Sequence, residues 1–304
     1  MADSDRLSPY ATPSATRAVL EAHGLYTKYG LGQNFLINDD IVRKIVSLAD
    51  LQPTDHVLEV GPGIGTLTAA LLQCAGHVTS VEMDHDLPAV LADTLAQWAD
   101  RFTLVEKDGL DLMEADLGTQ AALPNKMVSN LPYAVAATIV LDYFQRFPFL
   151  GSATVMVQKE VADRMCAHPG TKTYGAYTVK LSLYAQPAGR FPVSPGNFFP
   201  PPHVESAVLR LDRAVPCDGE GHPLDDETRR TACTMADAAF ANRRKTIANS
   251  FKTYLAGQGD AGKSLLENLP ALFDQAAIDP RRRGETLEQQ DFIRLAQIAL
   301  ELAR

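Results

Sequence analysis

The chain has 304 residues, of which 46% are hydrophobic and 21% are charged, with 20 Gly and 19 Pro. This composition excludes a largely disordered chain and suffices for one large domain and one small domain, each with its own core. The formal net charge is -9, which taken alone argues against a nucleic-acid partner, because phosphate binding requires local positive charge.

The cysteines and the first residues bear on the cellular compartment. The four Cys are scattered without a C-x-x-C pair, so a metal site and a disulfide framework are both disfavoured and a reducing compartment is expected. The first 24 residues contain no continuous apolar segment of the kind a signal peptide has. No stretch approaches the ~20 apolar residues of a membrane span. The sequence therefore predicts a soluble cytoplasmic protein.

The first two thirds of the chain alternate between two hydrophobic patterns. Residues 1–16 are polar, contain two prolines, and are expected to form a loose tail. After them, apolar residues at helical spacing alternate with short apolar runs that are typical of strands. The expected helices cover 41–49, 67–74, 87–99, 135–147 and 161–167, and the expected strands cover 56–60, 78–81, 102–105, 127–128 and 153–157. This alternation predicts an α/β fold with a mostly parallel, doubly wound sheet.

The pattern changes after residue 180. Two apolar runs, 191–193 and 206–211, are joined by a proline-rich loop without a full helix, which predicts an antiparallel pair at the sheet edge. Beyond residue 226 only helical patterns occur, over 227–241, 244–255 and 289–303. The sequence thus predicts a tail at 1–16, an α/β domain at 17–213, a linker rich in breakers and acids at 214–226, and a small all-helical domain at 227–304.

A glycine-rich turn, Glu59-Val-Gly-Pro-Gly-Ile-Gly65, follows the first long strand. Glycines let the main chain turn tightly and let a ligand approach the backbone. A dinucleotide-binding loop reads G-x-G-x-x-G, whereas the spacing here is G-x-G-x-G with an acid two residues before it. This resembles the first motif of S-adenosylmethionine (SAM) methyltransferases, with Gly61, Gly63 and Gly65 as candidate cofactor-binding residues. A ligand-free turn is the alternative for this motif alone.

Two acids, Glu82 and Asp108, stand at the ends of the next two expected strands. The carboxyl ends of parallel strands line one crevice, so both acids should face the ligand of the glycine turn. A carboxylate at Glu82 suits two ribose hydroxyls, and Asp108 can accept a hydrogen bond from an adenine amino group. Each acid alone could equally be a solvated loop residue. Their order after the glycine turn favours the binding site.

The segment Asn130-Leu-Pro-Tyr133 follows the fourth strand of the alternation. An adenine N6 amine is a poor nucleophile because its lone pair is conjugated into the ring, and two acceptors on its N–H groups would localise that lone pair. Asn130 Oδ1 and the Leu131 carbonyl can supply them, since Pro132 keeps Leu131 extended. Tyr133 offers a face on which a base can stack. A plain Asn-x-Pro turn is the alternative.

Segments along most of the chain resemble the ribosomal RNA small-subunit adenine N6,N6-dimethyltransferase family, over roughly residues 26–303. They are Gly32-Gln-Asn-Phe-Leu36, the glycine turn, Asn130-Leu-Pro-Tyr133, Gln158-Lys-Glu-Val-Ala-Asp-Arg164, Phe198-Phe-Pro-Pro-Pro-His-Val-Glu-Ser206, Phe240-Ala-Asn-Arg-Arg-Lys-Thr246 and Arg283-Gly-Glu-Thr-Leu287. The resemblance implies a Rossmann-like class I methyltransferase domain, SAM as methyl donor, no metal, and a protein that acts as a monomer.

The resemblance also assigns roles to individual residues. Asn34 and Leu36 would contact SAM near its methionine end, and Gly61 would lie along it. Glu82 would bind the ribose and Asp108 the adenine. Asn130 would contact both cofactor and target amine. The target adenine, flipped out of its stack, would lie between Tyr133 and Phe198.

The implied substrate is a pair of adjacent adenines in a hairpin loop near the 3′ end of 16S rRNA. A chain this acidic should bind naked RNA weakly, so the expected partner is 16S rRNA within an immature small subunit. The expected contact surface is built from the two dense basic clusters of the C-terminal third, Arg243, Arg244, Lys245, Arg281, Arg282 and Arg283.

Three alternatives stay open at this stage. An Erm-type enzyme would methylate 23S rRNA, although those proteins are usually strongly basic. A ribosome-assembly factor would use the same surface and act mainly by binding. A nicotinamide-dependent dehydrogenase is the most distant, because the G-x-G-x-x-G spacing is missing.

Overall fold

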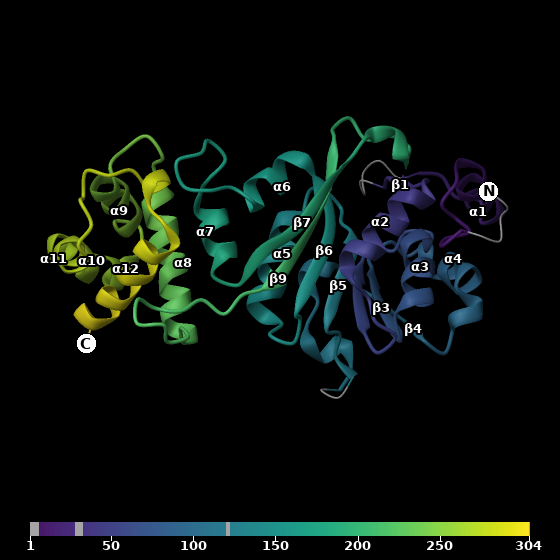
Figure 1. Cartoon of the computed structure of the whole chain (residues 1–304), viewed down its shortest axis with the longest axis horizontal. Coiled ribbons are helices and arrows are strands. Elements are labelled where there is room, and N and C mark those ends of the chain that lie inside the picture. The colour runs from purple at the N-terminus through teal and green to yellow at the C-terminus, as the bar shows by residue number, and fades with distance from the viewer. Residues whose placement is uncertain (1–5, 28–32, 120–121, 304) are drawn as a thin grey trace. The chain divides into compact units, whose positions relative to one another are not determined.

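The computed structural model describes residues 6–27, 33–119 and 122–303. It divides into two compact units (Figure 1). The first comprises residues 1–162 and 187–213, and the second comprises 163–186 and 214–304. The first unit carries the sheet and the second is built from helices.

The first unit is organised around a seven-stranded sheet with the order β4-β3-β2-β5-β6-β9-β7. The strands are β2 (His56–Val60), β3 (His77–Glu82), β4 (Phe102–Glu106), β5 (Lys126–Asn130), β6 (Ser152–Gln158), β7 (Ala185–Val193) and β9 (Ser206–Arg213). The five strands β2 to β6 are parallel, and β9 runs antiparallel to β6. The expected mostly parallel sheet with an antiparallel edge is confirmed.

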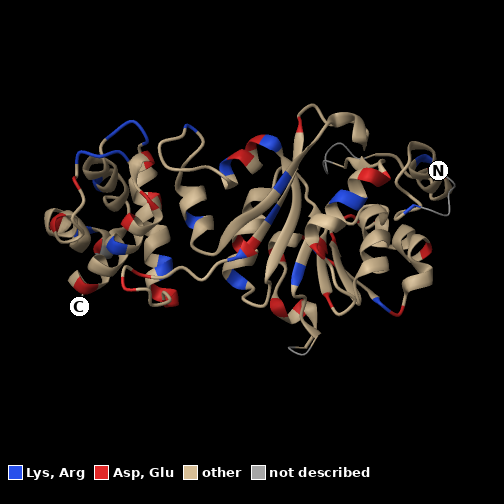
Figure 2. Ribbon diagram, in the orientation of Figure 1, with Lys and Arg blue, Asp and Glu red and all other residues tan. Residues whose placement is uncertain are grey.

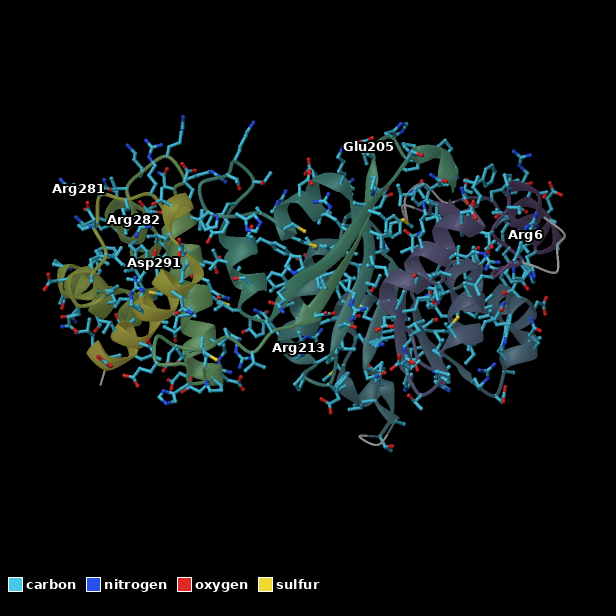
Figure 3. The ribbon with its side chains drawn as sticks, in the orientation of Figure 1. Arg6, Glu205, Arg213, Arg281, Arg282 and Asp291 are labelled. Carbon is cyan, nitrogen blue, oxygen red and sulfur yellow. The ribbon has the colours of Figure 1, made fainter. Side chains whose placement is uncertain are left out.

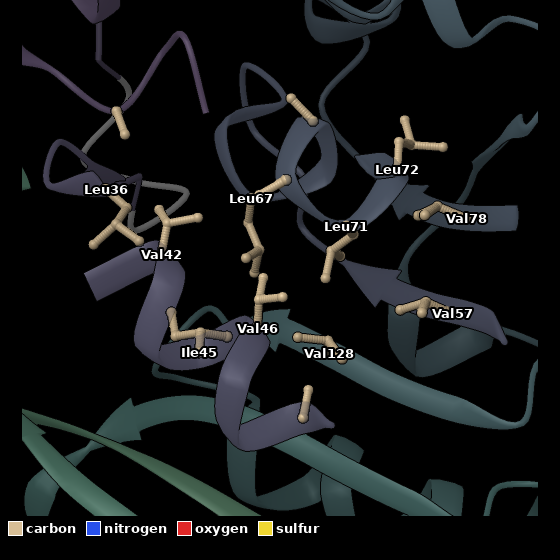
Figure 4. Packing of buried hydrophobic residues seen from close by; sticks show 14 of the residues in the cluster. Leu36, Val42, Ile45, Val46, Val57, Leu67, Leu71, Leu72, Val78 and Val128 are labelled. Carbon is tan, nitrogen blue, oxygen red and sulfur yellow. The ribbon is translucent and has the colours of Figure 1, made fainter. Parts of the chain in front are cut away.

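Helices cover this sheet and bury its apolar residues. They are α2 (Asp39–Ala49), α3 (Thr66–Cys74), α4 (Leu87–Thr94), α5 (Ala136–Arg146) and α6 (Lys159–Met165), whereas α1 (Pro13–Ala22) places Leu20 in a separate apolar cluster with Leu87 and Val90. Figure 4 shows part of the main core, where Val46 and Leu71 from two helices meet Val57 and Val128 from two strands. Parallel strands are apolar on both faces because helices cover both. This explains why the sequence shows continuous apolar runs.

The segment before α2 is not the loose tail expected for residues 1–16. Residues 1–5 lie outside the described part, but residues 6–16 are packed. The amides of Leu7 and Ser8 donate to the carboxylate of Asp39 at 3.1 and 2.8 Å, and the Tyr10 hydroxyl donates to the Thr94 carbonyl at 2.6 Å. Thr16 is fully buried. These partners lie far along the chain, so the local composition does not indicate them.

A second, two-stranded sheet pairs β1 (Phe35–Leu36) with β8 (Phe198–Phe199). Leu36 lies opposite Phe198 in antiparallel register. This small sheet joins a segment near the N-terminus to the proline-rich loop that precedes β9.

The second unit is helical, with α7 (Ala176–Ser182), α8 (Asp226–Phe240), α9 (Ile247–Leu255), α10 (Gly259–Glu267), α11 (Leu269–Gln275) and α12 (Gln289–Leu302). Residues 163–186 belong here and not to the α/β domain expected at 17–213. The reason is packing of α7 on α8, where Lys180 Nζ lies 2.9 Å from Asp237 Oδ1. Among the described residues, no helix is long and apolar enough to cross a membrane.

Residues 214–226 also form part of the second unit instead of an open linker. The segment folds back on itself, with the Leu224 amide donating to the Pro216 carbonyl at 3.0 Å. Leu224 is buried, and Asp225 caps α8 by accepting from the Thr228 amide at 2.7 Å. The breakers of this segment therefore make a closed turn and a helix cap.

Candidate active site

A cavity of about 370 Å³ opens in the first unit at the carboxyl ends of β2, β3 and β5. Three expected elements of the site line it: the glycine turn, the two strand-end acids, and the Asn130–Tyr133 segment. Asn34 and Leu36 line it as well. Residue Gly32 of the same motif lies outside the described residues. Carboxyl ends of parallel strands are the usual place for a ligand in this type of sheet.

The glycine turn exposes its backbone to the cavity at Gly61 and Gly63, which have no side chains. Gly61 and Gly63 have φ of 73° and 61°, in the left-handed region that favours glycine. A Cβ on Gly63 would lie 3.0 Å from Phe35 Cε1. Gly65 also has positive φ, but it is the N-cap of α3, faces Thr94 and Leu95, and does not line the cavity. Of the three expected glycines, two therefore contribute to the cavity wall.

Glu82 ends β3 and points its carboxylate at main-chain amides. Its Oε1 accepts from the Asp84 amide at 2.8 Å, and the Gly63 amide also bonds to the carboxylate. Burial raises the pKa of Glu82, and the side chain is 8% exposed. A carboxylate fixed by amides in a buried wall can present its remaining oxygen capacity to two hydroxyls of a ligand.

Asp108 lies across the same end of the sheet, in the turn after β4. Its Oδ1 accepts from the Leu110 amide at 2.9 Å. The turn approaches the sheet closely because Gly109 has no side chain: a Cβ there would lie 2.9 Å from Val60 Cγ1. The hydroxyl of Tyr143, in α5, donates to the Gly109 carbonyl at 2.8 Å and holds the turn in place.

Asn130 ends β5 at the centre of the site. Its Nδ2 donates to the main-chain carbonyl of Asn34 at 3.2 Å. The Leu131 amide donates to the Met156 carbonyl at 3.2 Å, which anchors the start of the turn to β6. Because the amide nitrogen of Asn130 is used by Asn34, its Oδ1 is left as an acceptor.

Tyr133 lies in the turn between β5 and α5 and lines the cavity. Its hydroxyl lies 2.5 Å from Ser206 Oγ, and burial raises the pKa of the phenol. The ring is only partly buried, so part of it is available to a ligand.

Phe198 is not brought to the cavity, and the sandwich expected between Tyr133 and Phe198 is not formed in this structure. Phe198 is 2% exposed, pairs with Leu36 across the two-stranded sheet, and packs in the main core cluster. Its neighbour Phe199 is half-buried, with the Arg17 guanidinium 5.2 Å from the ring centroid. The apolar pairing with Leu36 explains why the ring of Phe198 is covered.

Two polar residues at the cavity were not singled out as site residues from the sequence. Glu59 is 1% exposed, and its Oε2 accepts from the Thr68 and Ser80 hydroxyls, both at 2.7 Å. Burial raises the pKa of Glu59 to about 7. Gln33 Nε2 donates to Asp84 Oδ2 at 2.7 Å and ties the segment before β1 to the turn after β3. The acid before the glycines was the one sequence signal for Glu59; Gln33 had none apart from its motif.

The two basic clusters of the C-terminal third lie side by side in the second unit. The Ile247 amide donates to the Arg282 carbonyl at 2.8 Å and the Ala248 amide to the Pro280 carbonyl at 3.2 Å, which joins the two loops. We call this surface the basic face; Figure 2 shows its two loops in blue, and its six residues are Arg243, Arg244, Lys245, Arg281, Arg282 and Arg283. All of them except the half-buried Arg282 are exposed.

The arginines of the basic face differ in how they are held. Arg282 Nη1 lies 3.3 Å from the buried carboxylate of Asp291, and both residues are labelled in Figure 3. Arg281 pairs with Asp279 but keeps its side chain 86% exposed. Arg243 bonds Glu285 at 3.2 Å. Arg282 thus stabilises the loop that contains it, while Arg243 and Arg281 keep their charged groups exposed to solvent.

Metal-binding residue types do not gather in the described part of the chain. Across residues 6–27, 33–119 and 122–303, no three His, Cys, Asp or Glu side chains lie close enough to hold an ion together.

The parallel sheet, the glycine turn and the two strand-end acids around one cavity define a class I methyltransferase. Solved structures share this fold: a dimethyladenosine transferase from Plasmodium falciparum has a TM-score of 0.73 at 22% identity, covering 88% of this chain and 98% of that one. The 23S rRNA methyltransferase ErmE has a TM-score of 0.62 at 24% identity, covering 87% and 98%.

Sequence comparison narrows the class. The family model for ribosomal RNA adenine dimethylase matches residues 25–287, and the chain belongs to this family. It is similar to proteins named ribosomal RNA small subunit methyltransferase A. One from Corynebacterium diphtheriae is 41% identical, covering 88% of each chain. One from Mycobacterium sp. (strain KMS) is 42% identical, covering 88% of this chain and 87% of the relative.

Proposed function

We propose that this protein transfers methyl groups from SAM to the N6 atoms of two adjacent adenines in a hairpin loop near the 3′ end of 16S rRNA. The observation that carries this proposal is the bond from Asn130 Nδ2 to the Asn34 carbonyl, which leaves an acceptor at the centre of the cavity. The relatives named as small subunit methyltransferases support the choice of rRNA.

The cavity fits SAM in both size and lining. A volume of about 370 Å³ lies in the range of small-molecule sites. The glycine turn offers bare backbone and carries no phosphate-type spacing, Glu82 would hold the ribose hydroxyls, and Asp108 would hold the adenine amino group. Asn34 and Leu36 would contact the methionine end. SAM, when bound, supplies an electrophilic methyl group on a sulfonium centre.

The protein's own residues act on the target amine. Asn130 Oδ1 and the Leu131 carbonyl would accept its two N–H groups, which localises the nitrogen lone pair toward the incoming methyl. Tyr133 would stack on the base and hold it at the distance and angle for in-line displacement. We assign no general base, because the positively charged product amine loses a proton to water. For the second methylation, the monomethylated base would stay in the pocket or rebind there.

The basic face would bind rRNA, and the overall charge would restrict which RNA is bound. A net charge of -9 weakens association with naked RNA, so a structured, immature small subunit is the expected partner. We further propose that the protein acts in the cytoplasm as a monomer without a metal ion.

Tritium transfer from labelled SAM tests the proposal. The substrates compared are immature small subunits that lack these methyl groups, mature small subunits, large subunits and naked 16S rRNA. The labelled products are identified by nucleoside analysis. The expected product is N6,N6-dimethyladenosine in the immature small subunit only. Label in the large subunit would indicate an Erm-type activity, and particle binding without label would indicate an assembly factor. Either result contradicts the proposed function.

A further inference from the structure

Tyr133, which lines the cavity, is hydrogen-bonded to a serine that does not line it. The Tyr133 hydroxyl and Ser206 Oγ are 2.5 Å apart, with either able to donate. Ser206 is fully buried and does not line the cavity, whereas Tyr133 does. Ser206 therefore cannot touch a ligand there, and any effect it has on one is transmitted through the Tyr133 ring.

The two partners differ in how firmly their backbones are held. Ser206 is the first residue of β9 and lies opposite Gln158 of β6, and next to this pair the Lys159 amide donates to the Glu205 carbonyl at 2.9 Å. Tyr133 lies in the irregular turn before α5, closed by a bond from the Val135 amide to the Pro132 carbonyl at 3.2 Å. Because Ser206 is held in the ladder between β9 and β6, its hydroxyl provides a fixed anchor for the phenol oxygen of Tyr133.

The position of the bond on the ring matters for stacking. The phenol oxygen lies on the Cβ–Cγ axis at the far end of the ring, so a bond there restrains χ1 and fixes where the ring lies, whereas rotation about χ2 leaves the oxygen in place. Burial raises the pKa of Tyr133, so the hydroxyl keeps its proton and the bond persists at neutral pH. Phe198, the other expected stacking partner, is buried in the core in this structure. The position of the Tyr133 ring is then the main restraint on a stacked base.

We propose that Ser206 is a positioning residue for methyl transfer, which acts by holding the Tyr133 ring in the position at which the target adenine stacks. This inference rests on the proposed function. Ser206 is not a catalytic residue, because it touches neither the target base nor the cofactor.

Three variants test this coupling: Ser206→Ala, Tyr133→Phe and the double variant. Each single change removes the same bond and keeps the ring, so each should lower kcat on immature small subunits by roughly 5- to 10-fold, the equivalent of one hydrogen bond. The double variant should be no slower than the slower single variant. SAM affinity, measured by calorimetry, should stay within twofold of the wild-type value.

A base-stacking signal separates positioning from general damage. Immature small subunits whose 16S rRNA carries 2-aminopurine at the target position should show stronger fluorescence with Ser206→Ala than with the wild type, because stacking on Tyr133 quenches it. The matched control is Thr154→Val, which removes a buried hydroxyl from the neighbouring strand β6; within the described residues this oxygen has no hydrogen-bond partner. It should leave kcat and fluorescence unchanged.

Two results would overturn the inference. One is a Ser206→Ala protein with wild-type kcat and fluorescence while the wild type is active. The other is a double variant whose loss equals the product of the single losses. If Ser206→Ala does not fold, Tyr133→Phe tests the same bond from the other side. A wild-type protein that methylates no rRNA would overturn the proposed function and this inference together.

Discussion

The side-chain amide of Asn130 donates to the main-chain carbonyl of Asn34 at 3.2 Å. This bond spans 96 positions of the chain and joins the end of β5 to the segment before β1. It decides which end of the amide faces the open side of the cavity, since only the nitrogen can donate. The acceptor that we propose for the target amine is thereby oriented by a bond within the protein itself.

Truncating this side chain should strongly slow methyl transfer. In Asn130→Ala neither the bond to Asn34 nor the acceptor proposed for the target amine remains. We expect kcat at saturating SAM to fall by about 100-fold or more, in the range seen for lost transition-state hydrogen bonds. The measurement is tritium transfer to immature small subunits. Thermal unfolding should stay close to that of the wild type; a kcat within threefold of wild type would refute the assignment.

A methyl group on Gly63 should weaken cofactor binding. Gly63→Ala adds a Cβ at φ 61° and 3.0 Å from Phe35 Cε1, which displaces the Phe35 segment that lines the cavity. We expect SAM affinity to fall by tenfold or more in calorimetry, with a stability loss above about 1 kcal/mol.

Gly24→Ala is the matched control for this change. Gly24 has φ 63°, but a Cβ there meets nothing within 4 Å. The control should therefore show the backbone cost of about 1 kcal/mol and unchanged SAM affinity. Equal loss of affinity in both variants would show that strain alone, and not contact with Phe35, explains the effect.

Local sequence was sufficient for the parts of the site that lie at strand ends. The apolar runs place Glu82 and Asn130 at the ends of β3 and β5 and Asp108 just beyond β4, and parallel strands bring such residues to one edge. This conclusion does not depend on the order of the strands in the sheet, so the cavity wall could be predicted. The two-stranded sheet of β1 and β8 could not, because it pairs short segments that are far apart in the sequence.

The remaining features depend on partners that the local pattern does not specify. Phe198 was expected at the cavity because of its motif, yet its pairing with Leu36 buries it. Residues 6–16 were expected to be loose, yet Asp39 binds two of their amides. Residues 163–186 were assigned to the α/β domain, yet α7 packs on α8. Each difference arises from packing between segments distant in sequence.

Cofactor binding should depend on pH through Glu82. Burial raises its pKa, so the carboxylate gains a proton at a higher pH than an exposed glutamate does. Only the ionised form accepts from both ribose hydroxyls, so SAM affinity should decrease as pH falls through this raised pKa, by up to about tenfold per pH unit. Calorimetry over a pH series measures this. Glu82→Gln should bind weakly at every pH, whereas Asp108→Asn should bind weakly but keep the slope.

The basic face should control particle binding and its salt dependence. Reversing Arg243, Arg244, Arg281 and Arg283 to Glu should weaken binding to immature small subunits and reduce the slope of log K against log salt by roughly 0.7–0.9 for each phosphate that the variant no longer binds. Arg282 is kept because it pairs with the buried Asp291. Lys263→Glu, in α10 of the same unit, is the control and should leave the slope unchanged. An unaltered slope in the fourfold variant would exclude this face.

Glu59 should make the folded protein less stable as pH rises. Its pKa is about 7 in the folded state against an ordinary value of 4.5, so the unfolded chain releases this proton first. The contribution is fully present below pH 4.5 and is lost as pH rises through 7, at a cost of up to about 3 kcal/mol. Glu59→Gln mimics the protonated acid, so its free energy of unfolding in urea should exceed the wild-type value at pH 8 and approach it at pH 5. Glu114→Gln, at an exposed position, is the control and should follow the pH dependence of the wild type. The expected direction would be contradicted if the wild type gained stability relative to Glu59→Gln between pH 5 and pH 8.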